Sequence, residues 1–167
     1  MIDKHHLDPV TVTFYAFERA ARKAFEPANP QDLTIDACIE LADAAFHHLQ
    51  CAAPWPVAVR PRLFDGVEAA FCTLVETQVE GDAFFLIGLP PGRRRPWVVL
   101  HEVAHTLHWE DGHGPHFAWT CIQLWIHVGG WDGTALMTLA REYRIDGPEH
   151  LSRQDVRRLT DSTGLIL

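Results

Sequence analysis

The stretch VVLHEVAHTLHWEDGHGPHF, Val98 to Phe117, contains five of the 11 histidines of this chain. His101 and His105 are four residues apart among uncharged neighbours, a pattern typical of a helix that buries its sides. Side chains at this spacing leave the same helix face about 5–6 Å apart at Cβ, so both imidazoles can reach one zinc ion. Glu102 is rotated away from direct ligation but can reach a water bound to the metal, where a general base is needed. The stretch therefore predicts a helix that carries a metal site.

A catalytic zinc site of this kind needs a third protein ligand. The nearby candidates are His108, His113, His116, His127, Glu110 and Asp111. His108 stands about 10.5 Å along the helix from His101, too far to share an ion comfortably. His113 lies between two glycines, which allow the backbone to reverse sharply and turn this side chain back toward the metal. His116, one turn into the next predicted helix, is the rival third ligand.

The segments HEVAH and DGHGPHF together resemble the HExxH and HGxxF elements of the SprT-like (Spartan-like) zinc metallopeptidases, which belong to the zincin superfamily. The spacer of seven residues between His105 and His113 is shorter than in Spartan itself, and closer to that of small metallohydrolases of bacteria and their phages. The similarity covers about Phe84 to Phe117. It implies that His113 is the third ligand of one zinc ion, that Gly114 and Phe117 are structural, and that a sheet edge lines the substrate cleft.

The chain departs from related zincin proteins in several ways. Its four cysteines are scattered without a CxxC pair, which excludes a zinc ribbon and indicates reduced thiols. The formal charge of −8 argues against a nucleic-acid partner, because phosphate contacts require clustered Lys and Arg. The short run Arg93–Arg95 is interpreted as a solvated loop. The metzincin pattern is not met, because His108 stands where that pattern has glycine. In gluzincins the third ligand is an acidic residue distant in the sequence, and the candidate for that role in this chain is Glu142.

Apolar spacing in the first half of the chain predicts N-terminal helices followed by a small antiparallel sheet. The two helical stripes are Val10, Phe14, Phe17, Ala21 and Ala24, then Ile35, Cys38, Ile39, Ala42, Phe46 and Leu49. Val57 and Val59 alternate with polar or small residues. The alternation in 70–79 and 83–89, separated by a short turn, predicts an antiparallel hairpin.

The second half of the chain returns to helical spacing. Pro96 and Pro115 suit the first turns of the active-site helix and of the helix after it. The pattern resumes in 134–145, and Ser152 with Asp155 resembles the capping box of a last short helix. The whole chain, 1–167, is therefore expected to form one α+β domain of the zincin type. The apolar runs are far short of the roughly 20 residues of a membrane helix, and no signal-peptide core begins the chain, so we expect a cytoplasmic protein.

These features predict a zinc-dependent metallohydrolase, in the first place a peptidase that acts on protein or peptide substrates. Zinc on His101, His105 and His113 would lower the pKa of a water, and Glu102 would take its proton and return it to the leaving amine. The candidate donors to the tetrahedral oxygen are His116, His108, His127, Tyr143 and Arg93–Arg95. The alternative is a zinc-stabilised binding or regulatory module with the same fold and little activity, in which His116 or Asp111 would fill the fourth position.

Overall fold

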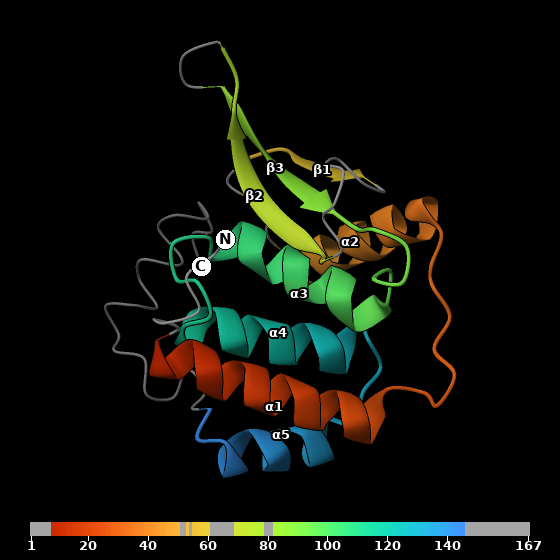
Figure 1. The fold of residues 1–167 in the computed structure, drawn as a ribbon, viewed down its shortest axis with the longest axis vertical. Coiled ribbons are helices and arrows are strands. Elements are labelled where there is room, and N and C mark those ends of the chain that lie inside the picture. Colours follow the sequence, from red (N-terminus) through yellow and green to blue (C-terminus); the bar gives the residue numbers. More distant parts are fainter. Residues whose placement is uncertain (1–7, 51–52, 54, 61–68, 79–81, 146–167) are drawn as a thin grey trace.

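The computed structural model describes residues 8–50, 53, 55–60, 69–78 and 82–145 (Figure 1). Within this part of the chain the elements are α1 (Pro9–Phe25), α2 (Ile35–Leu49), β1 (Val57–Arg60), β2 (Phe71–Glu76), β3 (Ala83–Gly88), α3 (Pro96–Leu107), α4 (Pro115–His127) and α5 (Gly133–Glu142). The α+β class predicted from the sequence is confirmed. The predicted last helix near Ser152 lies outside the described residues. No helix in the described part has both the length and the apolar character needed to cross a bilayer.

The three strands form one sheet in the order β1–β3–β2. β2 and β3 pair antiparallel, with Cys72 opposite Ile87, which confirms the predicted hairpin. β1 runs parallel to β3, with Val59 opposite Ile87, so the sheet is mixed and the prediction of an antiparallel sheet is wrong. Burial accounts for the order, because β3 is buried along almost its whole length and takes the central position. The chain reverses direction twice between β1 and β3, which makes these two strands parallel.

The helices are stacked against one face of the sheet and against each other. In Figure 1, α3 lies next to the sheet, followed by α4, α1 and α5. One core runs through the stack and includes the fully buried Phe17 of α1, Val99 of α3 and Trp125 of α4. Each such side chain stabilises the fold by about 1.5–3 kcal/mol through burial. Val10 and Ile39, which the spacing placed in the apolar stripes, are instead 49% and 37% exposed.

The arginine run before α3 connects two distant segments. Arg94 donates from Nε to the Leu89 carbonyl at 3.0 Å. Arg95 donates to the Pro30 carbonyl, and its Nε lies 3.6 Å from a carboxylate oxygen of Asp32. The interpretation of this run as a solvated loop is therefore wrong for these two arginines. The Arg95 side chain, together with the Arg94 carbonyl, which accepts a hydrogen bond from the Leu33 N–H, holds the connection between α1 and α2 against the start of α3, the helix that carries the HExxH motif.

Candidate metal centre

Helix α3 is buried along most of its length. Pro96 occupies its first turn, and Val99 is completely buried. His101 and Glu102 are 7% and 6% exposed, and His105 is half-buried. The ring centroids of His101 and His105 lie 5.0 Å apart, as expected for side chains separated by one helical turn. Apolar neighbours thus hold both histidines of the motif in an interior position.

The bend between α3 and α4 turns His113 back toward α3. Gly112 has a φ of 59°, in the left-handed region that favours glycine. Gly114 packs so closely against the Asp111 carboxylate that a Cβ on this glycine would overlap with Oδ1. The same carboxylate accepts a hydrogen bond from the Phe117 N–H at 3.0 Å, which fixes the first turn of α4. The two glycines and the aspartate together therefore determine where His113 points.

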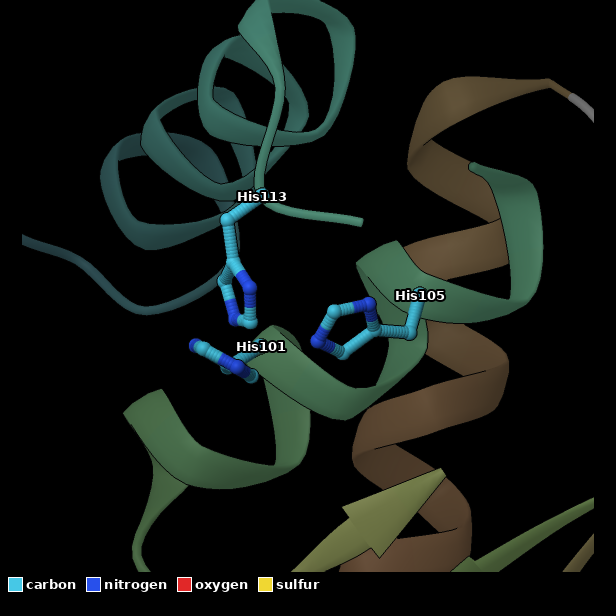
Figure 2. A group of neighbouring side chains, drawn as sticks. All are labelled: His101, His105 and His113. Atoms are coloured by element: carbon cyan, nitrogen blue, oxygen red, sulfur yellow. The ribbon is translucent and has the colours of Figure 1, made fainter. Parts of the chain in front are cut away.

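The imidazoles of His101, His105 and His113 face one another (Figure 2). The ring centroid of His113 lies 5.4 Å from that of His101 and 4.8 Å from that of His105. One nitrogen of each ring lies within 4.8 Å of the corresponding nitrogens of the other two. Two nitrogens bound tetrahedrally to one zinc ion stand about 3.4 Å apart, so small side-chain rotations would bring all three to coordination distance. Among the described residues, no other group of three or more side chains has this arrangement.

The rival ligands lie elsewhere in the described structure. His108 has its Nε2 2.8 Å from the Thr120 hydroxyl, and its ring centroid is 6.0 Å from that of His116. His127 is exposed at the end of α4 and stacks on His48, with ring centroids 4.9 Å apart. Glu142 is exposed at the end of α5. The structure therefore brings His113, and none of these alternatives, beside His101 and His105.

The chemistry of the three imidazoles fits one zinc ion. The Nε2 of His113 is buried and has no hydrogen-bond partner among the described residues. A buried polar atom without a partner costs about 1–3 kcal/mol, and coordination of a metal would remove that cost. The pKa of His105 is lowered to about 2 and that of His113 to about 4, chiefly by burial and then by neighbouring imidazoles. Both rings are therefore neutral near pH 7, the form in which histidine binds zinc.

Glu18 of α1 holds the ring of His101. Its Oε1 lies 2.7 Å from His101 Nδ1, and the two side chains are only 12% and 9% exposed. If Nδ1 carries the proton and donates to the carboxylate, Nε2 is left free to face the metal position. Burial lowers the pKa of His101, but the hydrogen bond to Glu18 and the charges of Glu102 and Glu18 outweigh this effect and raise it. The sequence analysis did not single out Glu18.

Glu102 lies in the same cleft as His101 and His105. Burial raises the pKa of its carboxyl group to about 7, against the opposing effect of His101, while the Glu18 carboxylate adds to the rise. A carboxyl group that titrates near neutral pH can accept a proton and release it again. The electrostatic environment of Glu102 is thus suited to general base and general acid chemistry.

Two buried phenylalanines support the histidine rings. Phe117 stacks on His105, with ring centroids 4.1 Å apart, and meets His101 and His113 edge-on at 5.1 and 4.8 Å. Phe14 of α1 lies 5.2 Å from Phe117 and 5.6 Å from His113 between ring centroids. Both phenylalanines are completely buried. The structural role that the resemblance implies for Phe117 therefore corresponds to contacts with all three imidazoles.

A cleft of about 360 Å³ opens beside His101 and His105. One wall consists of four successive residues of β2, 71–74, and Tyr15 of α1 and Trp109 also line it. Successive side chains of a strand point to opposite faces, so the edge of β2, rather than one face, borders the cleft. β2 lies at an edge of the sheet that the described strands form. The cleft thus lies between the candidate metal centre and the edge of a strand.

Comparison with known proteins adds no assignment: no family model, no curated protein and no solved structure matches the chain. The resemblance to the SprT-like metallopeptidases is therefore carried by the motif residues His101, Glu102, His105 and His113.

Sequence reasoning missed the contribution of α1, which supplies both Glu18 and Tyr15. One signal was present for Glu18. It follows Phe14 by four residues on a helix whose buried stripe also includes Phe17 and Ala21, so the spacing places an acid on the buried face. A buried carboxylate requires a partner. The sequence did not indicate that this partner would be a histidine of the metal motif, because α1 and α3 are far apart in the chain.

Proposed function

We propose that this chain is a zinc-dependent metallohydrolase of the zincin type that cleaves peptide bonds. One zinc ion would be held by His101, His105 and His113, with Glu102 as the general base. The observation that carries the proposal is the convergence of three imidazoles, one with a buried and unpartnered Nε2, together with a nearly buried carboxyl group in the cleft that His101 and His105 line. A site that only stabilises the fold has no need of such a carboxyl group.

Zinc bound by these imidazoles would acidify a water molecule and polarise the carbonyl group of the substrate. Glu102 accepts a proton from the water while the oxygen of that water attacks the carbonyl carbon. Glu102 then gives this proton to the amine nitrogen as the C–N bond breaks. A carboxyl pKa of about 7 is suited to both transfers, because neither form of the group is strongly favoured at neutral pH. Glu18 keeps the His101 ring oriented throughout.

The strand edge in the cleft supports an extended polypeptide as the substrate. The edge of β2 at residues 72–74 borders the cleft, and a polypeptide can add to the edge of a sheet through backbone hydrogen bonds. Uncharged side chains make up most of the surrounding wall, Phe85 and Trp109 among them. In the described lining, Glu102 is the one carboxylate and no Lys or Arg is present. We therefore expect uncharged side chains next to the scissile bond.

The alternative, a zinc-stabilised binding module, requires a fourth protein ligand. Its two candidates are otherwise engaged. The Asp111 carboxylate accepts the hydrogen bond from the Phe117 N–H, and His116 lies beside His108. Catalytic zinc sites have three protein ligands and keep one coordination position open to water and substrate. This geometry favours the catalytic proposal.

Metal analysis and hydrolysis of a labelled protein together test the proposal. Untagged protein should contain about one zinc ion per chain, and so should the matched control His116→Ala, whereas His113→Ala should lose the metal. Glu102→Gln should keep zinc and lose hydrolysis of fluorescein-labelled casein. Hydrolysis at the wild-type rate by zinc-loaded Glu102→Gln would refute the mechanism. Retention of tight zinc binding by His113→Ala would refute the ligand assignment.

A further inference from the structure

Attack of water on an amide places negative charge on the carbonyl oxygen, and a hydrogen-bond donor aimed at this oxygen accelerates the reaction. The donors expected from the sequence do not line the cleft among its described residues. His108 is close to Thr120 and His116, and Arg94 donates to the Leu89 carbonyl. Tyr143 packs against Phe17 and does not line this cleft; it lines a second pocket, which His113 also lines. The donor must therefore come from another part of the molecule.

Three side chains with a neutral O–H or N–H donor, other than histidine, line the cleft: Tyr15, Thr73 and Trp109. Thr73 alternates along β2 with Cys72, which packs against the core beneath the sheet, so its side chain points to the other face, away from α3. Trp109 is 49% exposed in the bend after α3. Tyr15 has its ring against the candidate ligand His113, with centroids 4.6 Å apart. Of the three side chains, Tyr15 is thus the one placed beside a candidate metal ligand and therefore near the carbonyl group of a bound substrate.

Helix α1 holds Tyr15 in this position. The neighbouring residues Phe14 and Phe17 are completely buried. Glu18, about one helical turn after Tyr15, is hydrogen-bonded to His101. Tyr15 itself is 36% exposed, so one part of its ring packs against His113 while the rest faces the cleft. The O–H of a phenol is a hydrogen-bond donor. Glu102 reaches the cleft from α3, so base and donor come from different helices.

We propose that Tyr15 is a catalytic residue whose phenol O–H donates a hydrogen bond to the carbonyl oxygen of the scissile amide. This inference rests on the proposed function. As the water oxygen bonds to the carbonyl carbon, the π electrons of the C=O bond move to oxygen and Glu102 takes a proton from the water. The C=O bond then re-forms, the C–N bond breaks, and the amine nitrogen takes the proton from Glu102. The phenol proton stays on Tyr15 throughout, and its hydrogen bond is strongest when the oxygen is most negative.

The test is Tyr15→Phe, which removes only the hydroxyl group. The matched control is Tyr143→Phe, because the chain contains two tyrosines and the other one lies outside the cleft. A peptide is first selected from the casein digest of the wild-type protein. Its phosphonamidate analogue, in which a tetrahedral phosphorus replaces the carbonyl carbon, is then used as a binding probe in calorimetry. Zinc content and melting temperature establish that each variant is folded and loaded.

Tyr15→Phe should keep its zinc. Its KM for the peptide should be unchanged, while its kcat should fall about 10²–10³-fold. Its affinity for the phosphonamidate should fall by a similar factor, and Tyr143→Phe should match the wild type in every measurement. A zinc-loaded Tyr15→Phe protein with wild-type kcat and phosphonamidate affinity would overturn the role of Tyr15 and leave the proposed function standing. Failure of the zinc-loaded wild type to cleave casein would overturn the proposed function itself, and the inference with it.

Discussion

Replacement of Glu18 measures how much a carboxylate on α1 contributes to metal binding on α3. In Glu18→Leu, the hydrogen bond of 2.7 Å to His101 Nδ1 is lost between two side chains that are 12% and 9% exposed. The ring is then free to rotate, and Nδ1 competes with Nε2 for the proton. Loss of such a partner lowers metal affinity about 10–100-fold, which corresponds to about 1.4–2.7 kcal/mol. We expect the weaker zinc binding of Glu18→Leu to lie in this range.

Glu18→Gln divides this effect into its two parts. The amide oxygen of glutamine can still accept the Nδ1 proton, but the negative charge is lost. Hydrogen bonds to charged groups contribute about 1.5–3 kcal/mol and neutral ones about 0.5–1.5 kcal/mol, so Gln should preserve roughly half of the free energy. Glu18→Gln should therefore bind zinc with an affinity between those of the wild type and Glu18→Leu.

The assay is competition for zinc with a chromogenic chelator at pH 7.5. Glu40→Leu is the matched control, because Glu40 is an exposed acid on α2, away from the candidate ligands. Its zinc affinity should equal that of the wild type. The reasoning is refuted if a folded Glu18→Leu protein, with its helical circular dichroism unchanged, binds zinc as tightly as Glu40→Leu.

Three further outcomes are expected. Glu102 has a folded pKa of about 7 against 4.5 for the ordinary group, so its contribution to stability is present below pH 4.5 and lost as the pH rises through 7. The free energy of unfolding of metal-free Glu102→Gln should therefore be higher than that of the metal-free wild type, by up to about 3 kcal/mol at pH 8 and by little at pH 4.5. Urea titrations that give the same difference at both pH values would contradict this. Gly114→Ala places a Cβ against the Asp111 carboxylate and forces it away from the Phe117 N–H, so it should loosen the bend that holds His113 and weaken zinc binding by up to about 10-fold, while a chelator competition with wild-type affinity would contradict this. Zinc at 100 times its Kd should stabilise the wild type by about 2.7 kcal/mol, and an unchanged melting temperature after removal of zinc with EDTA would argue against a metal site.

The part of the centre that follows from local periodicity could be predicted from the amino-acid sequence. His101 and His105 share a face because the helical repeat places residues four apart on neighbouring turns. The position of α3 between Pro96 and Leu107 agrees with the proline and the uncharged flanks of the motif. The glycines around His113 indicated a reversal of the chain, and the bend has that form. These are properties of a few neighbouring residues, which constrain one another directly.

Contacts between distant segments could not be predicted in the same way. Alternation in β1 indicates a strand, but it does not indicate that the strand runs parallel to β3. The stripe on α1 shows which face is buried, but not that this face meets His101, 83 residues away from Glu18. The approach of Tyr15 to His113 likewise depends on the stacking of α1 beside α4. A repeat of apolar residues shows which face of a helix or strand must be buried. It does not show which other element buries that face, because many apolar surfaces could pack against it. Packing of the whole chain makes that choice, and with it brings the carboxylate and the phenol of α1 to the three imidazoles.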